Sequence, residues 1–315
     1  MASYGLQLPN FSLGVADTEL FETVAAMAVA SEAAGFESLW VMDHFYQLPM
    51  LGGENQPMLE AYTLLGALAA RTSKVGLGTL VTGVTYRNPA MLAKIVTTLD
   101  VISGGRAWLG IGAAWHDLEH EALGFDFPPV AERMDRLEEA LEICRAMFRS
   151  EEPTFEGAHY RTKKALNLPP PIRPGGPRIL IGGGGERRTL RLVARFADAC
   201  NLFGDAVNVR HKIEVLHRHC DEVGRDPSEI RVTRLGSLFV TESAAQSEEL
   251  RSNLGASMAA DALAAMVIGE ADEVGAQLSD LVEAGVETFV FNLPLGHDAA
   301  AVEAAGAALA AALPT

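Results

Sequence analysis

Short apolar segments alternate with amphipathic segments along the whole chain. Each amphipathic segment has the 3.6-residue spacing of a helix and follows an apolar segment with the composition of a buried strand. Eight such strand–helix units predict a (β/α)8 TIM barrel, although periodicity alone also permits an open, doubly wound sheet. The expected strands are Tyr4–Leu8, Glu37–Met42, Lys74–Val81, Arg106–Ile111, Arg178–Ile181, Ala199–Phe203, Arg231–Val240 and Glu287–Phe291.

Two connections are longer than a plain barrel needs. The chain has 315 residues, whereas a minimal barrel needs roughly 250, so we expect one domain over residues 1–315 with two insertions. Residues 150–177 contain a hairpin-like stretch and three successive prolines, and they are in a position to edge or cover the site. Residues 243–269 are rich in alanine, which predicts an extra helix near the barrel mouth, serving as a lid or as a dimer surface.

Four glycines separate one strand from the helix after it. Gly182, Gly183, Gly184 and Gly185 follow Ile179–Ile181 directly. Glycine lets the backbone approach a ligand, and the free N–H groups that open a helix favour an anion. The junction therefore predicts a phosphate-binding loop, with a flexible connection as the alternative. It has neither the lysine of a Walker A loop nor the G-x-G-x-x-G spacing.

Two arginines strengthen the case for an anion at this junction. Arg187 and Arg188 fall in the expected first turn of the helix, where the helix dipole favours acidic side chains. We therefore expect an anionic group to compensate both charges. The alternative is a basic helix on the protein surface.

The carboxyl ends of barrel strands are where catalytic side chains gather. Asp43 and His44 follow the second strand, either as a functional pair or as ordinary turn residues. After the third strand, Gly78–Gly83 offers small and hydroxyl residues suited to lying against a flat ring, with a glycine-rich turn as the alternative. After the fourth strand, Gly112 and Ala113 favour close approach of a broad ligand. Asn201 and Asn292 complete the rim, as site residues or as turn residues.

A metal site after the fourth strand is the competing interpretation. Histidine and glutamate side chains spaced three or four residues apart share one face of a helix. No complete H-E-x-x-H pattern is present, so we expect no metal. The residues concerned are Trp115, His116, Glu119 and His120.

The charge and the cysteines narrow the class of protein. With 25 basic and 41 acidic residues the formal charge is −16, which disfavours nucleic acid and anionic lipid as partners. The sequence has no apolar run of roughly 18 residues and no export signal, so we expect a cytoplasmic protein. Cys144, Cys200 and Cys220 lack metal-binding spacing and are expected to be reduced.

Taken together, these motifs resemble the luciferase-like monooxygenase superfamily of flavin and deazaflavin barrels. The chain looks most like the branch that depends on the deazaflavin coenzyme F420. The resemblance covers nearly the whole chain, and its motifs are Tyr4–Phe11, Leu39–Phe45, Leu80–Pro89, Leu109–Trp115 and Gly182–Leu192.

The resemblance implies a cofactor ring lying across the barrel mouth. The ring would contact the end of the third strand, where family members often hold a non-proline cis peptide, matching Leu80-Val81 here. The other implied cofactor contacts are Thr82, Gly112, Ala113, the four glycines and the two arginines after the fifth strand, and the implied catalytic residues are His44 and Asp43. One departure concerns substrate, because sugar-phosphate dehydrogenases of this family carry a glutamate where this chain has Ala113-Ala114-Trp115.

Three functions fit these expectations. The first is an F420-dependent oxidoreductase that moves a hydride between the coenzyme and an unidentified small organic substrate, acting as a homodimer. The second is an FMN-dependent monooxygenase that uses reduced flavin and oxygen. The third is a flavin-binding protein with little turnover, because fold and cofactor pocket do not establish catalysis.

Overall fold

Eight parallel strands close into a barrel in the computed structural model, which describes residues 2–256, 258, 263 and 266–313. Strand β12 pairs with β1 on one side and with β10 on the other, and β10 also pairs with β9, so the ring has no open edge. The open-sheet alternative is therefore wrong. Around the ring the strands are β1 (Ser3–Leu8), β2 (Ser38–Val41), β3 (Gly76–Thr79), β5 (Ala107–Gly112), β8 (Arg178–Gly182), β9 (Ala199–Leu202), β10 (Arg231–Val240) and β12 (Thr288–Asn292).

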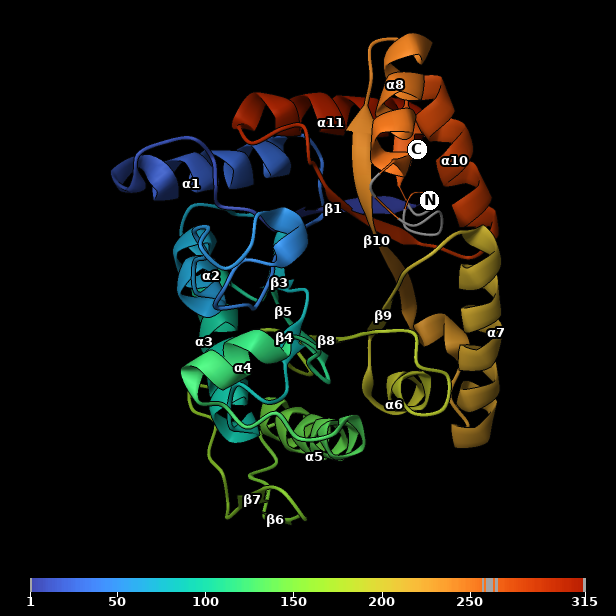
Figure 1. The fold of residues 1–315 in the computed structure, drawn as a ribbon. Coiled ribbons are helices and arrows are strands. Elements are labelled where there is room, and N and C mark those ends of the chain that lie inside the picture. The colour runs from blue at the N-terminus through green and yellow to red at the C-terminus, as the bar shows by residue number, and fades with distance from the viewer. Residues whose placement is uncertain (1, 257, 259–262, 264–265, 314–315) are drawn as a thin grey trace.

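A helix follows each barrel strand and packs against the outside of the ring, as Figure 1 shows. Most of the core lies between the strands and these helices, because each helix turns one apolar face inward. The predicted (β/α)8 barrel is confirmed. The eight helices are α1 (Asp17–Ala33), α2 (Ala61–Ala69), α3 (Pro89–Ser103), α5 (Val130–Phe148), α6 (Thr189–Phe196), α7 (Ala206–Val223), α10 (Ala271–Glu283) and α11 (Ala299–Ala312).

A second, smaller core fills the barrel interior. The rings of Trp40 and Trp108 lie 5.7 Å apart between their centroids. Gly78 lies beside both, and a Cβ there would sit 2.8 Å from an atom of the Trp40 ring. Glycine in β3 therefore provides the space that two interior indoles require. Leu80, Leu180, Ala199 and Val290 complete this cluster.

The third predicted strand, Lys74–Val81, is interrupted in the structure. Strand β3 ends at Thr79, the peptide bond between Leu80 and Val81 is cis, and a two-residue strand β4 (Thr82–Gly83) pairs with β5. The cis bond implied by the family resemblance is thus present. It places a bulge at the mouth end of the barrel, beside β5.

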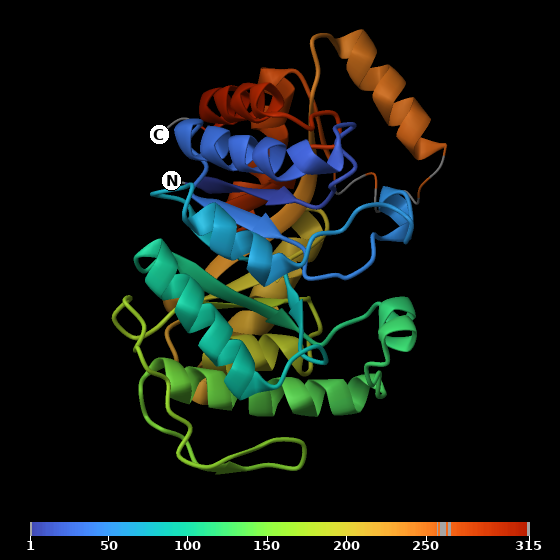
Figure 2. The ribbon, with the colours of Figure 1, turned by 90° about the vertical axis from the view of Figure 1, so that its left-hand side faces the viewer.

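The first insertion packs on the outside of the barrel. Strands β6 (Phe155–Glu156) and β7 (Arg161–Thr162) form an antiparallel hairpin. The Glu139 carboxylate in α5 accepts hydrogen bonds from the N–H groups of Ala158, His159 and Tyr160. In Figures 1 and 2 the hairpin lies beyond α5, so it borders that helix and does not cover the strand ends.

Several short elements extend on the mouth side of the barrel. Figure 2 shows α4 (Asp117–Leu123), the 3-10 turn η1 (Pro49–Leu51) and α8 (Ala244–Gly255) projecting from the same side. Helix α8 is the extra helix expected in the second insertion, and β11 (Val267–Gly269), which follows it, pairs with β10. Residues 257, 259–262 and 264–265 of this insertion lie outside the described residues.

Two further points complete the fold. A second 3-10 turn, η2 (Pro227–Glu229), precedes β10. In the part of the chain that the structure describes, no helix has the length and apolar character needed to cross a membrane.

Candidate active site at the barrel mouth

The Val81 side chain occupies the space between two of the predicted cofactor glycines. A Cβ on Gly112 or on Gly182 would lie 3.0 Å from a methyl group of Val81. These two glycines therefore accommodate the bulge after β3, in addition to any ligand above it. The Gln7 side chain in β1 supports the bulge from the other side, because its Nε2 donates a 2.9 Å hydrogen bond to the Leu80 carbonyl.

Thr82 and Ala113, the other predicted ring contacts, lie beside the bulge. The Thr82 hydroxyl is buried and bonds to the hydroxyls of Tyr62 at 2.7 Å and Thr79 at 2.9 Å. It therefore faces the protein interior. Ala113 is half-buried, and its carbonyl accepts a 3.0 Å hydrogen bond from Arg133 Nε.

Asp43 is buried in an ion pair with Arg87. The Arg87 guanidinium donates to both Asp43 carboxylate oxygens at 2.6 and 3.1 Å and to Glu60 at 2.7 Å. Burial raises the pKa of the Asp43 carboxyl, and the bidentate pair with Arg87 opposes that rise. The predicted functional pair of Asp43 and His44 is thus not joined by a hydrogen bond, because Arg87 holds the Asp43 carboxylate.

Glu119 of α4 orients the His44 ring instead. Its Oε1 lies 2.6 Å from His44 Nδ1 and also accepts a hydrogen bond from the Tyr86 hydroxyl, while its Oε2 accepts one from the Phe45 N–H at 2.7 Å. Burial alone would raise the pKa of Glu119, but these hydrogen bonds outweigh burial and lower it to about 2.

This pairing selects the tautomer of His44. A carboxylate accepts hydrogen bonds only, so Nδ1 carries the proton. Nε2 makes no hydrogen bond to any residue that the structure describes. The ring contacts Trp115 and His116 edge-on, with centroids 5.7 Å away in both cases. His44 thus presents one nitrogen that can accept a proton.

The sequence indicated Glu119 only as a candidate metal ligand. Both ring nitrogens of His120, the next residue of that candidate set, have other partners. Nε2 lies 2.6 Å from Thr85 Oγ1, and Nδ1 lies 2.6 Å from the His116 carbonyl oxygen. The pairing of His44 with Glu119 joins residues 75 positions apart. The available signal was a glutamate inside an aromatic segment, which needs donors when it is buried.

The glycine loop lies between β8 and α6 and has open backbone donors. Gly183 has a left-handed φ of +111°, and its N–H donates to the Asn201 carbonyl at 3.2 Å. Among the described residues, none accepts a hydrogen bond from the N–H of Gly184 or Gly185. Lys212 of α7 lies above the loop, since a Cβ on Gly184 would be 3.5 Å from its Cε. These features suit a phosphate group.

The two arginines behave differently from each other. Helix α6 begins at Thr189, so both precede the helix and do not form its first turn. Arg188 pairs with Asp135 of α5 and also donates to the Ala131 carbonyl. Arg187 is exposed, and Lys212 pairs with Glu186 at 2.6 Å. Of the two charges, Arg187 is the one without an ion pair among the described residues.

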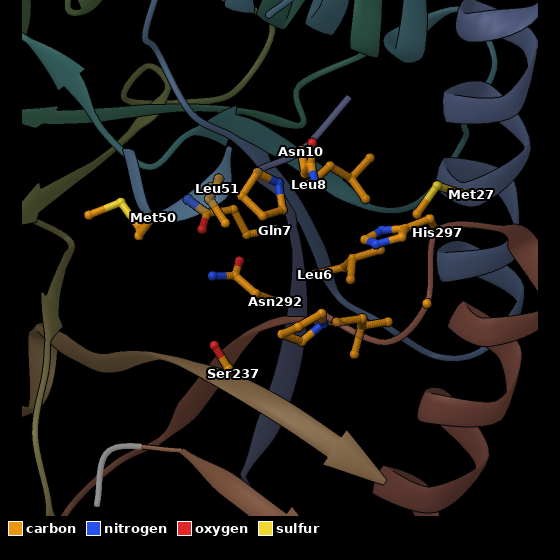
Figure 3. Close-up of a pocket in the computed structure, with 14 residues that line it drawn as sticks. Leu6, Gln7, Leu8, Asn10, Met27, Met50, Leu51, Ser237, Asn292 and His297 are labelled. Atoms are coloured by element: carbon orange, nitrogen blue, oxygen red, sulfur yellow. The ribbon is translucent and has the colours of Figure 1, made fainter. Parts of the chain in front are cut away.

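A cavity of about 250 Å³ opens on the other side of the mouth, between the ends of β1, β10 and β12 and the turn η1. Figure 3 shows the amides of Gln7 and Asn292 and the hydroxyl of Ser237 pointing toward the same space. Asn292 and Ser237 face inward because each stands two positions after an interior residue of its strand. The Oδ1 atom of Asn292 is buried and has no hydrogen-bond partner among the described residues.

Known proteins share both the sequence and this architecture. A relative from Segniliparus rotundus named F420-dependent glucose-6-phosphate dehydrogenase is 31% identical over 304 residues, covering 86% of this chain and 87% of the relative. The structure of an F420-dependent secondary alcohol dehydrogenase in complex with an F420–acetone adduct has a TM-score of 0.81 at 22% identity, and the match covers 99% of both chains.

A monooxygenase has the same fold. EDTA monooxygenase from Chelativorans sp. BNC1 has a TM-score of 0.83 at 16% identity, and the match covers 99% of this chain and 93% of that one. At these identities the two structures establish the fold alone. Residues 4–265 match the family described as luciferase-like monooxygenase. The chain therefore belongs to the luciferase-like monooxygenase family.

Proposed function

We propose that this protein is an F420-dependent oxidoreductase that transfers a hydride between the coenzyme and a small organic substrate. The single observation that carries the proposal is the orientation of His44 by Glu119, which leaves Nε2 open at the mouth. The choice of coenzyme is supported by the name of the relative that is 31% identical over 86% of the chain.

The residues at the mouth fit such a coenzyme. The bulge at Leu80-Val81 offers a backbone surface for a ring, and the open N–H groups of Gly184 and Gly185 are suited to a phosphate. Arg187 supplies positive charge beside the loop. Lys212 supplies a second charge if a phosphate replaces Glu186 as its ion-pair partner. When bound, a deazaflavin accepts or releases a hydride and does not readily activate oxygen.

His44 handles the proton that accompanies hydride transfer. Because Nδ1 keeps its proton for Glu119, Nε2 accepts the proton of a substrate hydroxyl during oxidation and returns it during reduction. Asp43 and Arg87 neutralise each other and fix the end of β2 from which His44 projects. Asp43 is therefore a positioning residue in this proposal, and His44 is the acid–base catalyst.

The alternative is an FMN-dependent monooxygenase, because EDTA monooxygenase has a similar fold. Fluorescence titration of the protein with F420 and with FMN separates the two, and we expect F420 to bind more tightly. Anaerobic bleaching of F420 in the presence of substrate supports the proposal. Oxygen consumption with reduced FMN, without detectable F420 binding, would establish the alternative.

The expected homodimer and the cytoplasmic location stay predictions. Light scattering at micromolar concentration tests the first, and we expect twice the mass of the 33.6 kDa chain. Fractionation of the source cells tests the second.

A further inference from the structure

The cavity between β1, β10 and β12 has no fixed charge in its walls. None of the described residues that line it is a lysine, arginine, aspartate or glutamate. Its one titratable side chain is His297, which is exposed at the rim. A phosphate or carboxylate that entered this cavity would lose its hydration without gaining a cationic partner, which is costly.

The cavity adjoins the bulge on which the cofactor ring is proposed to lie. Gln7 lines the cavity and at the same time donates its hydrogen bond to the Leu80 carbonyl, so one side chain separates the cavity from the cis peptide. A molecule in the cavity is thus a direct neighbour of the ring position. At about 250 Å³ the cavity is just below the roughly 300–1,000 Å³ typical of ligand pockets, which points to a small ligand.

An unused acceptor also borders the cavity. Asn292 Oδ1 is buried with no partner among the described residues, and buried polar atoms usually have one. Apolar side chains, including Leu6, Met27 and Leu51, cover much of the remaining wall. A ligand that matches the apolar walls and the free acceptor is mainly apolar and carries one hydrogen-bond donor.

We propose that this cavity is the substrate pocket and that it selects an uncharged small molecule. Such a molecule carries a hydrogen-bond donor for Asn292 Oδ1, separate from the hydroxyl whose proton His44 accepts. The assignment as substrate pocket rests on the proposed function, whereas the ligand class follows from the walls. A phosphorylated sugar does not fit this chemistry, although the relative from Segniliparus rotundus carries the name of a glucose-6-phosphate dehydrogenase. Similarity over 86% of the chain thus coexists with a different substrate class.

The test compares two probes that differ by one phosphoryl group, cyclohexanol and cyclohexyl phosphate. Their affinities are measured by isothermal titration calorimetry on the full-length protein, with saturating F420 and again without cofactor. The second titration contains inorganic phosphate, which occupies the loop of Gly184 and Gly185. We expect cyclohexanol to bind at least about tenfold more tightly than the phosphate ester in both settings, because the ester would bring an unpaired charge into the cavity.

Three variants locate the interaction. Asn292→Leu removes the acceptor at similar volume and is expected to weaken cyclohexanol binding roughly fivefold to tenfold. Asn10→Leu is the matched control in the same cavity, because Asn10 Oδ1 is already bonded to the Ser12 N–H, and it should leave the affinity within about twofold. Met50→Lys adds a cation at the rim and should improve binding of the phosphate ester while sparing cyclohexanol.

The results separate this inference from the proposed function. Equal or tighter binding of cyclohexyl phosphate to the wild-type protein, no detectable cyclohexanol binding, or full affinity in a folded Asn292→Leu protein would each overturn the inference. Absence of F420 binding would overturn the proposed function alone, because the cofactor-free titrations still rank the two probes.

Discussion

The two halves of the barrel mouth use their polar groups in opposite ways. After β2 and β3 the charged groups are paired, with Asp43 held by Arg87 and Glu119 held by four donors that include His44. After β1, β10 and β12 the polar groups are neutral, and Asn292 Oδ1 has no partner among the described residues. The charged groups of the first half are paired within the protein, whereas the second half contains a buried acceptor that has no partner in the described part of the chain.

This difference separates the task of holding a catalyst from the task of holding a substrate. Buried charges are costly unless each is paired and hydrogen-bonded, so a side chain fixed by them has one orientation. An unsatisfied neutral acceptor costs less and gains a partner when a ligand binds. The half after β2 and β3 therefore holds the His44 ring in one orientation. The half after β1, β10 and β12 contains the groups that can select the ligand.

The largest expected effect comes from removing the catalyst in the charged half. His44→Ala eliminates the open Nε2, and we expect turnover to fall by roughly 10²–10⁴ while F420 affinity changes by less than about threefold. Single-turnover bleaching of F420 under anaerobic conditions measures the chemical step directly. His159→Ala is the matched control, because His159 lies on the hairpin outside α5, and it should leave the rate unchanged.

A purely structural role for His44 predicts another outcome. In that case His44→Ala lowers the melting temperature but leaves the single-turnover rate within a few-fold of wild type. Such a result in a folded protein would remove His44 from the mechanism, even though its contact with Glu119 is real.

The next effect concerns the stability of the same half. Arg87→Met leaves the Asp43 carboxylate buried without a cation, and breaking a buried pair in this way costs about 3–5 kcal/mol. Arg71→Met breaks the exposed pair of Arg71 with Glu22 and should cost less than about 1 kcal/mol. Urea unfolding of both variants measures the difference. Equal costs would show that the Asp43–Arg87 pair is not the anchor of this half.

The fold and the positions of the mouth residues could be predicted from the sequence, but their pairing could not. Strand-like and helical periods determine eight units and hence which residues reach the carboxyl ends. The partner of His44 depends on where α4 lies after β5. The sequence around Asp43 does not show that the Asp43 carboxylate pairs with Arg87. The composition of the cavity was equally hidden, because its walls come from residues as distant as Leu6 and His297.

The glycines show a second limit of reasoning from sequence. Gly112 and Gly183 look alike as small residues at strand ends. In the structure Gly112 makes room for Val81, whereas Gly183 has a positive φ in the open loop. A sequence pattern indicates that a side chain is missing, but not whether the protein or a ligand fills the space.

An acid titration gives the third prediction. The pKa of Glu119 in the folded protein is lowered to about 2 from its ordinary 4.5, so its contribution to stability is complete above pH 4.5 and is lost as the pH falls toward 2. The loss amounts to about 3 kcal/mol. Glu119→Gln should lack this part of the pH dependence in urea unfolding.

A matched carboxylate tests whether Glu119 also positions His44. The pKa of Glu32 is likewise lowered to about 2, by hydrogen bonds from Ser73, Lys74 and Val75 far from the mouth. Glu32→Gln should therefore lose a smaller part of the acid dependence, because Glu32 is only half-buried, and it should keep full turnover. Glu119→Gln should lose turnover as well, because an amide no longer selects the Nδ1 proton of His44. Equal turnover in the two variants would contradict the positioning role.

The smallest effect distinguishes the two kinds of glycine. Gly184→Val places a side chain where the loop N–H groups are open, at an ordinary contact distance from Lys212, so the barrel should stay folded. Losing one charge-assisted hydrogen bond to a phosphate corresponds to about 1.5–3 kcal/mol, or tenfold or more in F420 affinity. Gly112→Val is the counterpart, because its Cβ would lie 3.0 Å from Val81 and should destabilise the fold first. Fluorescence titration and thermal unfolding of both variants measure the two effects, and unchanged F420 affinity in a folded Gly184→Val protein would remove the loop from the cofactor site.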